Sequence, residues 1–225
     1  MTAYRGGENI YNGKREPMDV ELLTTDNGYS WRPVDPQRRV IYRGGGSEAD
    51  FEIADDGTLF GVIRNEAGDE TGWGSKVCRA PAGDIANWEC RSDPRKFDSP
   101  LVFKHAGEIY LIARRNRTRS GKYDLGWRWL PDTLQELCYL AAYWLTPKRT
   151  ALWRFDRDRL RIDWLLDLPS RGDTSFPALV PLNDRQYLLF NYSSPLAGPD
   201  KAWIWGQLTA TNIYANVITF PGPSP

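Results

Sequence analysis

The chain has 225 residues, of which 41% are hydrophobic, and its 29 Lys and Arg residues balance 29 Asp and Glu residues. This length allows one large domain or two small ones with a substantial core. The zero net charge argues against a general nucleic-acid binder and against binding to anionic membranes, because both functions need a basic excess. No apolar run reaches the roughly 18 residues that a transmembrane helix needs.

Residues 1–18 are rich in glycine and charge, and we expect them to be irregular. They lack the apolar segment of a secretory signal peptide, so a cytoplasmic location is the default, but the localisation stays open because an N-terminal part could be missing. The three cysteines show no CxxC spacing, and the sequence therefore predicts neither a metal site nor a cofactor. Cys78 and Cys90 could face each other across one hairpin, although free buried thiols are the favoured interpretation.

The stretch TTDNGYSW, residues 24–31, predicts a tight hairpin turn, because Asn27 and Gly28 can adopt positive φ. The Asp26 carboxylate is expected to accept hydrogen bonds from backbone N–H groups of this turn, and Trp31 is expected to cover the hairpin. The spacing of Thr24, Asp, Gly, Ser and Trp in this stretch is the Asp-box pattern of sialidases and related β-propellers. A plain hairpin turn of no particular family is the alternative.

Three further segments share one plan, in which an apolar strand, a turn and a second apolar strand follow one another. These segments span residues 47–66, 97–116 and 174–194, and a further hairpin follows each of them. Units of four short strands at a period of about 45–50 residues are typical of β-propeller blades. The sequence therefore predicts an all-β propeller with about three and a half blades over residues 19–220, followed by a tail at 221–225. A β-sandwich with irregular hairpins is the alternative.

The blade plan places the start of each innermost strand and the end of the next strand at the same face, close to the axis. Carboxylates stand at the three strand starts, and two arginines and a tyrosine stand at the three strand ends: Glu48, Asp98 and Asp173, then Arg64, Arg114 and Tyr192. We expect all six side chains to converge on one mouth of the propeller. The turn of residues 24–31 is expected at the opposite face, as is an exposed His105, the only histidine.

An insertion at residues 117–149 interrupts the third of these units, counting the partial blade first. Leu134 to Leu145 is apolar enough for a short helix, with Asp132 or Thr133 as its N-cap. A connection of this length is usually a lid or a binding element. Its aromatic residues could stack on a sugar ring or simply pack the insertion onto the blades: Tyr123, Trp127 and Trp129.

Together with the Asp-box spacing, the segments EADFEIADDGTLFGVIRNE, GEIYLIARRN and DLPSRGDTSFPALVPL resemble the sialidase-superfamily propellers, in particular bacterial BNR-type sialidase-like glycoside hydrolases. The resemblance covers most of residues 19–218 and implies a propeller of five or six blades when complete. It also implies hydrolysis or binding of a glycan, which could carry a carboxylate. Sialidases hold such a carboxylate with three arginines, and they use an aspartate as acid/base and a glutamate-activated tyrosine as nucleophile.

The resemblance suggests a role for each polar residue at the predicted mouth. The catalytic candidates are Asp98, Glu48, Asp173 and Tyr192. The substrate-binding candidates are Arg64, Arg114, Arg115, Glu66 and Trp127. The chain departs from the family because it has no Arg-Ile-Pro stretch, only one Asp box and no tyrosine with an obvious glutamate partner. Structural salt bridges, such as Arg64 with Glu48 or Arg114 with Asp98, are therefore an equally good interpretation of the charged residues.

Three functional hypotheses follow. The leading one is a glycan-active propeller that hydrolyses glycosidic bonds at its mouth. The second is a non-catalytic propeller that binds a carbohydrate or a protein. The third is another sugar enzyme with an arabinanase-like fold, which would centre on carboxylates instead of arginines. Because an incomplete propeller exposes apolar faces and strand edges, we also expect either an N-terminally truncated and inactive fragment or an oligomer that completes the ring, with truncation favoured.

Overall fold

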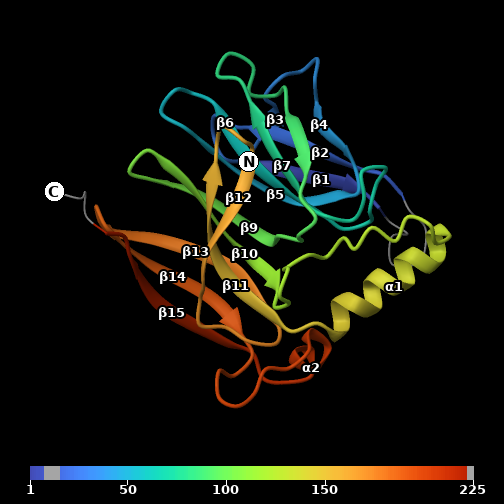
Figure 1. The fold of residues 1–225 in the computed structure, drawn as a ribbon. Helices are drawn as coiled ribbons and strands as arrows, with labels where there is room; N and C mark the ends of the chain where they lie inside the picture. Colours follow the sequence, from blue (N-terminus) through green and yellow to red (C-terminus); the bar gives the residue numbers. More distant parts are fainter. Residues whose placement is uncertain (8–15, 222–225) are drawn as a thin grey trace.

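The computed structural model describes residues 1–7 and 16–221. They form four sheets in which every paired strand is antiparallel, and this arrangement confirms the predicted all-β class (Figure 1). The first sheet contains β1 (Thr2–Gly6), β2 (Met18–Thr24), β3 (Arg32–Pro33) and β4 (Val40–Gly44). The second contains β5 (Gly46–Ile53), β6 (Leu59–Asn65), β7 (Lys76–Ala80) and β8 (Glu89–Ser92).

The third and fourth sheets continue this order along the chain. The third contains β9 (Asp98–His105), β10 (Glu108–Asn116), β11 (Lys148–Asp156) and β12 (Arg161–Asp167). The fourth contains β13 (Thr174–Asn183), β14 (Gln186–Ser193) and β15 (Asn212–Thr219). Two helices complete the part of the chain that the structure describes, namely α1 (Asp132–Leu145) and α2 (Trp203–Gln207). None of the described helices is long and apolar enough to span a membrane.

The sheets pack face to face in chain order, with one hydrophobic cluster between each neighbouring pair. Val20 and Leu22 of the first sheet share a cluster with Leu59 and Ile63 of the second. The second cluster joins the second sheet to the third, and the third cluster joins the third sheet to the fourth. The first strands β5, β9 and β13 contact one another in this order, so they form the inner side of the array (Figure 1). This radial packing rules out two stacked sheets and brings distant parts of the chain together.

Two predictions about the chain ends need correction. Residues 1–18 are not irregular throughout, because Thr2–Gly6 forms β1 and pairs along its length with β2. This polar strand has no apolar alternation that a sequence could reveal, and residues 8–15 of the same segment lie outside the described part. The hairpin expected after residues 174–194 is also incomplete, because the short helix α2 takes the place of its first strand and β15 alone follows within the described residues. Of the predicted tail, residues 222–225 also lie outside the described part.

β2 and β3 form a hairpin, as predicted, but its loop is longer than a tight turn, because Thr24 pairs with Arg32, and of Asn27 and Gly28 only Gly28 has a positive φ. The predicted hydrogen bonds of Asp26 are also absent from this turn. Thr25 Oγ1 accepts the Gly28 N–H at 2.9 Å, and Asn27 Oδ1 accepts the N–H groups of Tyr29 and Ser30, each at 2.9 Å. The Asp26 carboxylate instead pairs with the Arg32 guanidinium. The expected role of Asp26 is therefore wrong, because a neighbouring arginine is a stronger partner than a turn amide.

Cys78 and Cys90 form a disulfide between β7 and β8, so the expectation of free thiols is wrong. The two residues stand directly opposite each other in the strand register. His105 was expected to be exposed, but only 8% of its surface is accessible. Its ring stacks on Phe220, the residue directly after β15, with 4.0 Å between centroids.

A partly buried carboxylate links the second and third sheets. Asp50 on β5 accepts the backbone N–H of Val102 on β9 at 2.7 Å. Burial raises the pKa of Asp50 from 3.8 to about 6, although hydrogen bonds from Val102 and Phe51 oppose the shift. A raised pKa in the folded state means that stability falls as the pH rises from about 4 to about 6, because the unfolded chain loses its proton first.

Asp50→Asn should therefore stabilise the protein at neutral pH. The asparagine Oδ1 still accepts the Val102 N–H, and no buried charge forms. Denaturant unfolding should show a gain of about 2 kcal/mol above pH 6 that vanishes near pH 4. Asp56→Asn, which removes an exposed carboxylate in the following turn, is the matched control and should show no gain. An Asp50→Asn gain that is equal at pH 4 and pH 7 would exclude the titration as its cause.

Candidate functional site

The first strand of each inner hairpin begins, and the second ends, at the same end of the molecule. The residues that the sequence places there form one hydrogen-bonded and ion-paired network across three sheets. Arg64 Nη1 donates to Glu48 Oε1 at 2.9 Å, and Arg64 Nε lies 2.9 Å from Asp98 Oδ1. Arg114 Nη2 donates to the Tyr192 hydroxyl at 2.7 Å, and this hydroxyl donates to Asp173 Oδ1 at 2.9 Å.

Register shifts and unusual backbone angles at the strand starts orient these side chains. The register shifts near the start of β5, β9 and β13, where each strand pairs with its neighbour. Ser99 and Phe176 lie just after these starts and have positive φ values of 49° and 47°. Non-glycine residues rarely adopt such values, and β-bulges of this kind are common next to binding sites, where they redirect a side chain.

Arg64 is the cation of the network that pairs with three carboxylates. Besides Glu48 and Asp98, its Nη2 atom lies 2.6 Å from Glu66 Oε2. Burial alone would disfavour the cation, but the three carboxylates offset this effect and hold the pKa of Arg64 well above its ordinary value. Glu48 also accepts the Ser99 N–H, so it ties β5 to β9 as well. With three carboxylates around one guanidinium, Arg64 has no excess charge to offer a ligand.

Arg114 uses its donors within the protein. Its Nε atom donates to the Thr174 carbonyl, its Nη1 atom donates to the Tyr143 hydroxyl at 2.6 Å, and Nη2 lies 3.2 Å from Asp173 Oδ1. Arg114 is only 6% exposed. Arg114 therefore links the third sheet to the fourth sheet and to α1.

Asp98 is the carboxylate at the centre of the network, and it is only 2% exposed. It accepts a hydrogen bond from the Tyr143 hydroxyl at 2.8 Å in addition to its ion pair with Arg64. Burial opposes its ionisation, but Arg64, Lys96 and Arg114 outweigh burial and lower the pKa of Asp98 to about 2. Asp98 is thus ionised at neutral pH and cannot supply a proton there.

Tyr143 lies between two buried lysines. The Lys148 ammonium is 3.8 Å from the centroid of its ring, and the Lys96 ammonium is 5.0 Å away. Burial lowers the pKa of Lys148 well below its ordinary value, an effect that Asp98 opposes and Arg114 and Lys96 reinforce. These contacts fix Tyr143, and through it α1, to the network.

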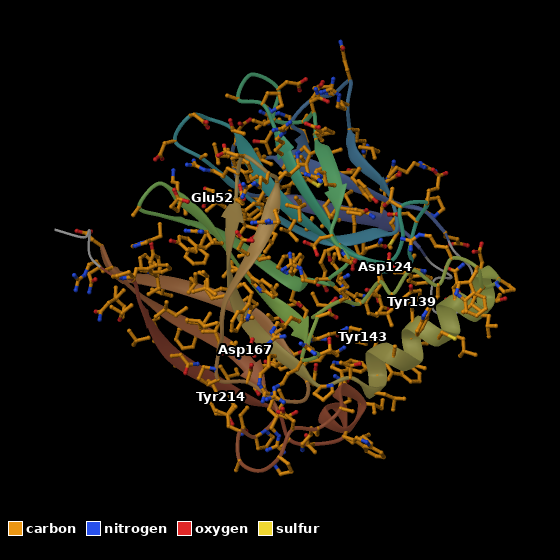
Figure 2. The ribbon with its side chains drawn as sticks, in the orientation of Figure 1. Glu52, Asp124, Tyr139, Tyr143, Asp167 and Tyr214 are labelled. Carbon is orange, nitrogen blue, oxygen red and sulfur yellow. A yellow bond between two sulfur atoms is a disulfide. The ribbon has the colours of Figure 1, made fainter. Side chains whose placement is uncertain are left out.

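The helix predicted within the insertion is present as α1, which begins at Asp132 and ends at Leu145. Its N-cap is Pro131, which makes no side-chain cap, so the predicted cap at Asp132 or Thr133 is wrong. Tyr139 and Tyr143 extend from α1 towards the strands (Figure 2). Tyr139 stacks on Trp73 with 4.9 Å between ring centroids and donates a hydrogen bond to Asp124. The helix is therefore packed firmly beside the mouth.

A cavity of about 490 Å³ opens at this end, between the network, α1 and α2. Five of the residues that the sequence proposed for the site line it, namely Arg64, Glu66, Arg114, Asp173 and Tyr192. Further lining residues come mainly from the insertion, from α2 and from the first residues of β13: Tyr123, Glu136, Leu140, Tyr143, Trp144, Phe176, Trp203 and Gln207. The sequence analysis missed Tyr143, Trp203 and Glu136, because the repeat offers no equivalent positions for them.

Four predicted site residues do not line this cavity. Asp98 and Glu48 lie behind Arg64 and hold it in place. Arg115 pairs with Asp167, since successive strand residues point to opposite faces and Arg114 already faces the cavity. Trp127 packs on Tyr139 with 5.2 Å between ring centroids, so the packing alternative describes this residue. Arg115 and Trp127 therefore lie outside the cavity wall, although the sequence had placed them among the substrate-binding candidates.

No family model and no curated protein sequence matches the chain. Among solved structures, the chain is similar to a protein of unknown function from Dyadobacter fermentans DSM 18053, with a TM-score of 0.54 and 12% identity over 84% of this chain and 57% of that one. It is also similar to a thermostable family-43 glycoside hydrolase, with a TM-score of 0.50 and 9% identity over 99% of this chain and 71% of that one. The fold is a β-propeller fold.

An α-L-arabinanase from Penicillium chrysogenum is more distant from this propeller, with a TM-score of 0.47 and 11% identity over 89% of this chain. The propeller chain spans about half the length of that arabinanase, namely 50%. At such low identities the similarities show the fold alone. The site's own chemistry must therefore carry any argument about its function.

Proposed function

We propose that this propeller acts on carbohydrate and that its cavity hydrolyses a glycosidic bond of a neutral sugar. The observation that carries the proposal is the composition of the cavity wall, which combines aromatic rings with carboxylates at the inner strand ends. Aromatic faces can stack on the apolar faces of sugar rings. Glycoside cleavage requires two carboxyl groups, one of which protonates the leaving oxygen while the other acts as nucleophile or base.

The charge of the wall favours a neutral sugar over an anionic one. Three cations line the cavity, namely Arg64, Lys96 and Arg114, and three carboxylates oppose them, namely Glu66, Glu136 and Asp173. Glu48 and Asp98 add two further negative charges behind Arg64. A sugar carboxylate would need guanidinium groups with free donors, and both arginines are already paired within the protein. The expected carboxylate clamp of a sialidase is therefore not part of this proposal.

Asp173 and Glu136 are the proposed catalytic pair. Asp173 Oδ1 receives hydrogen bonds from Tyr192 and Trp203, at 2.9 and 2.8 Å, and lies near Arg114, while Oδ2 takes part in none of these contacts. These donors fix the position of the carboxylate, as a nucleophile or base requires. Glu136 lines the cavity from α1 and, within the described part of the chain, has no hydrogen bond or ion pair with another residue, so its carboxyl group is available to act on the leaving oxygen as the general acid.

The remaining candidates of the network act as positioning residues in this proposal. Asp98 and Glu48 orient Arg64, and Glu66 joins Arg64 to Lys96, whose ammonium lies 3.3 Å from Glu66 Oε2. Tyr192 orients Asp173. Burial raises the pKa of Tyr192 well above its ordinary value, which disfavours the phenolate that a nucleophilic tyrosine would need.

A non-catalytic carbohydrate-binding propeller is the second candidate. One observation favours it, because both cavity arginines and two of the three lining carboxylates are engaged in ion pairs within the protein. A site of this kind could hold a sugar by its rings and hydroxyl groups without cleaving it. Binding and hydrolysis therefore need to be measured separately.

The proposal is tested with a panel of neutral oligosaccharides and chromogenic neutral glycosides, with sialosides included for comparison. We expect binding and hydrolysis of at least one neutral member and none of the sialosides. Phe176→Ala should weaken binding about tenfold, because the exposed Phe176 ring lines the cavity. Val180→Ala is the matched control, since Val180 is also exposed on β13 but lies outside the cavity. Sialoside hydrolysis would contradict the neutral-sugar assignment, and binding without hydrolysis would favour the second candidate.

A further inference from the structure

A second hollow region lies away from the cavity, between the outer strands of the second and third sheets. It consists of two adjoining hollows of about 590 and about 330 Å³ that share Arg95 and Ser120. We call them together the rim groove. None of its lining residues lines the cavity described above.

The rim groove is basic, although the chain as a whole is neutral. Seven cations line it, namely Arg91, Arg95, Arg115, Arg119, Lys122, Arg159 and Arg161. Four carboxylates reach these cations, namely Asp93, Asp156, Asp163 and Asp167. Three positive charges are therefore unbalanced along the groove, in a protein whose total charge is zero.

The cations of the groove differ in their partners. Arg159 and Arg161 are exposed but pair with Asp156 and Asp163, and Arg91 donates to the Arg159 carbonyl at 2.8 Å. Arg95 and Arg115 are anchored: Arg95 pairs with Asp93 and lies 5.0 Å from the ring centroid of Trp153, and Arg115 pairs with Asp167. Lys122 and Arg119 are exposed and make no ion pair among the described residues. The anchored pair forms the floor, and Lys122 and Arg119 remain available to a ligand.

We propose that the rim groove binds an anionic polysaccharide, a proposal that rests on the carbohydrate function proposed for the cavity. An extended row of cations suits a chain that carries repeated sulfate or carboxylate groups, because each charge contributes and releases counterions. Trp164 lines the groove beside Arg115, whose guanidinium lies 5.7 Å from its ring centroid, and it is 52% exposed, so part of its indole is open to a sugar ring. The groove would hold a charged region of a glycan while the cavity acts on a neutral region.

The test compares binding of the full chain to dextran sulfate and to uncharged dextran over a range of salt concentrations. Binding to dextran sulfate is expected, and it should weaken steeply with salt. The double variant Arg119→Glu/Lys122→Glu should lose at least about tenfold in affinity and show a shallower salt dependence. Arg185→Glu is the matched control, because it reverses an exposed charge in the turn between β13 and β14, outside the groove. Equal thermal stability of the variants should accompany these results.

The proposal is overturned if the double variant binds as the parent does, or if uncharged dextran binds equally well. Tighter binding of a single-stranded oligonucleotide than of dextran sulfate would assign the groove to nucleic acid and overturn it too. The two proposals fail separately. Loss of neutral-sugar binding at the cavity with dextran sulfate binding retained would refute the cavity function alone, and the reverse result would refute the groove alone.

Discussion

Asp173→Asn should reduce the hydrolysis rate, kcat, by about 10³-fold while the protein keeps its fold. Asparagine can still accept the hydrogen bonds of Tyr192 and Trp203 through its Oδ1 atom, so the cavity wall should stay in place. It cannot act as a nucleophile or base, because the amide carries no negative charge. Steady-state kinetics with the neutral glycoside found in the panel measures the loss.

The matched control for Asp173 is Asp167→Asn. Asp167 is also a carboxylate paired with an arginine, but it lies outside the cavity and bonds to Arg115. Its replacement should leave kcat within about twofold of the parent, because it touches no reacting group. If Asp167→Asn and Asp173→Asn have equal kinetics, the assignment of Asp173 is incorrect.

Glu136 allows the same experiment to distinguish the two carboxyl groups. Glu136→Gln should slow the hydrolysis of natural oligosaccharides about 10²-fold, because the leaving oxygen then lacks its proton donor. Aryl glycosides with a strongly acidic leaving group need no such proton and should be cleaved almost normally. An equal loss on both kinds of substrate would remove the acid role from Glu136.

Asp98→Asn should be the most destabilising single substitution in the network, at about 3–5 kcal/mol in the free energy of unfolding. The change removes the carboxylate that neutralises buried cations while Arg64, Lys96 and Arg114 remain. Asp26→Asn is the matched control, since it also removes an aspartate paired with an arginine but at a fully exposed site. Denaturant unfolding measures both, and the control should differ little from the parent.

The pH dependence of the unfolding free energy shows whether charge causes the loss of stability in Asp98→Asn. The pKa of Asp98 is about 2 in the folded protein and 3.8 in the unfolded chain, so its ionisation stabilises the fold above about pH 4. This contribution of about 2 kcal/mol disappears as the pH falls towards 2. The difference between the parent and Asp98→Asn should therefore shrink over this range. A difference that stays constant from pH 7 to pH 2.5 would point to packing instead of charge.

The strand repeat made much of this site predictable. A period of about fifty residues was enough to place Glu48, Asp98 and Asp173 beside Arg64, Arg114 and Tyr192, because equivalent positions of neighbouring sheets meet at the axis. The alternation of a strand could also have separated Arg114 from Arg115. The disulfide could not be predicted, since cysteine spacing in a hairpin does not reveal whether two thiols are oxidised.

Residues outside the repeat could not be placed in this way. Tyr143 belongs to the insertion and Trp203 to α2, so no equivalent position in another sheet indicates where they lie. Their positions depend on how helices pack against the mouth, which is a property of the whole fold. The same limit applies to the proposed acid Glu136, whose place in the cavity wall follows from the orientation of α1.

The charge network also bears on how the protein unfolds. Proteins built from repeated units can lose those units one at a time, because each contacts only its neighbours. Here Glu48 and Arg64 of the second sheet bond to the backbone and side chains at the start of β9, and Arg114 of the third sheet bonds to residues at the start of the fourth. Detaching any of these three sheets leaves buried charges without partners in another, so the three should melt together as one cooperative unit.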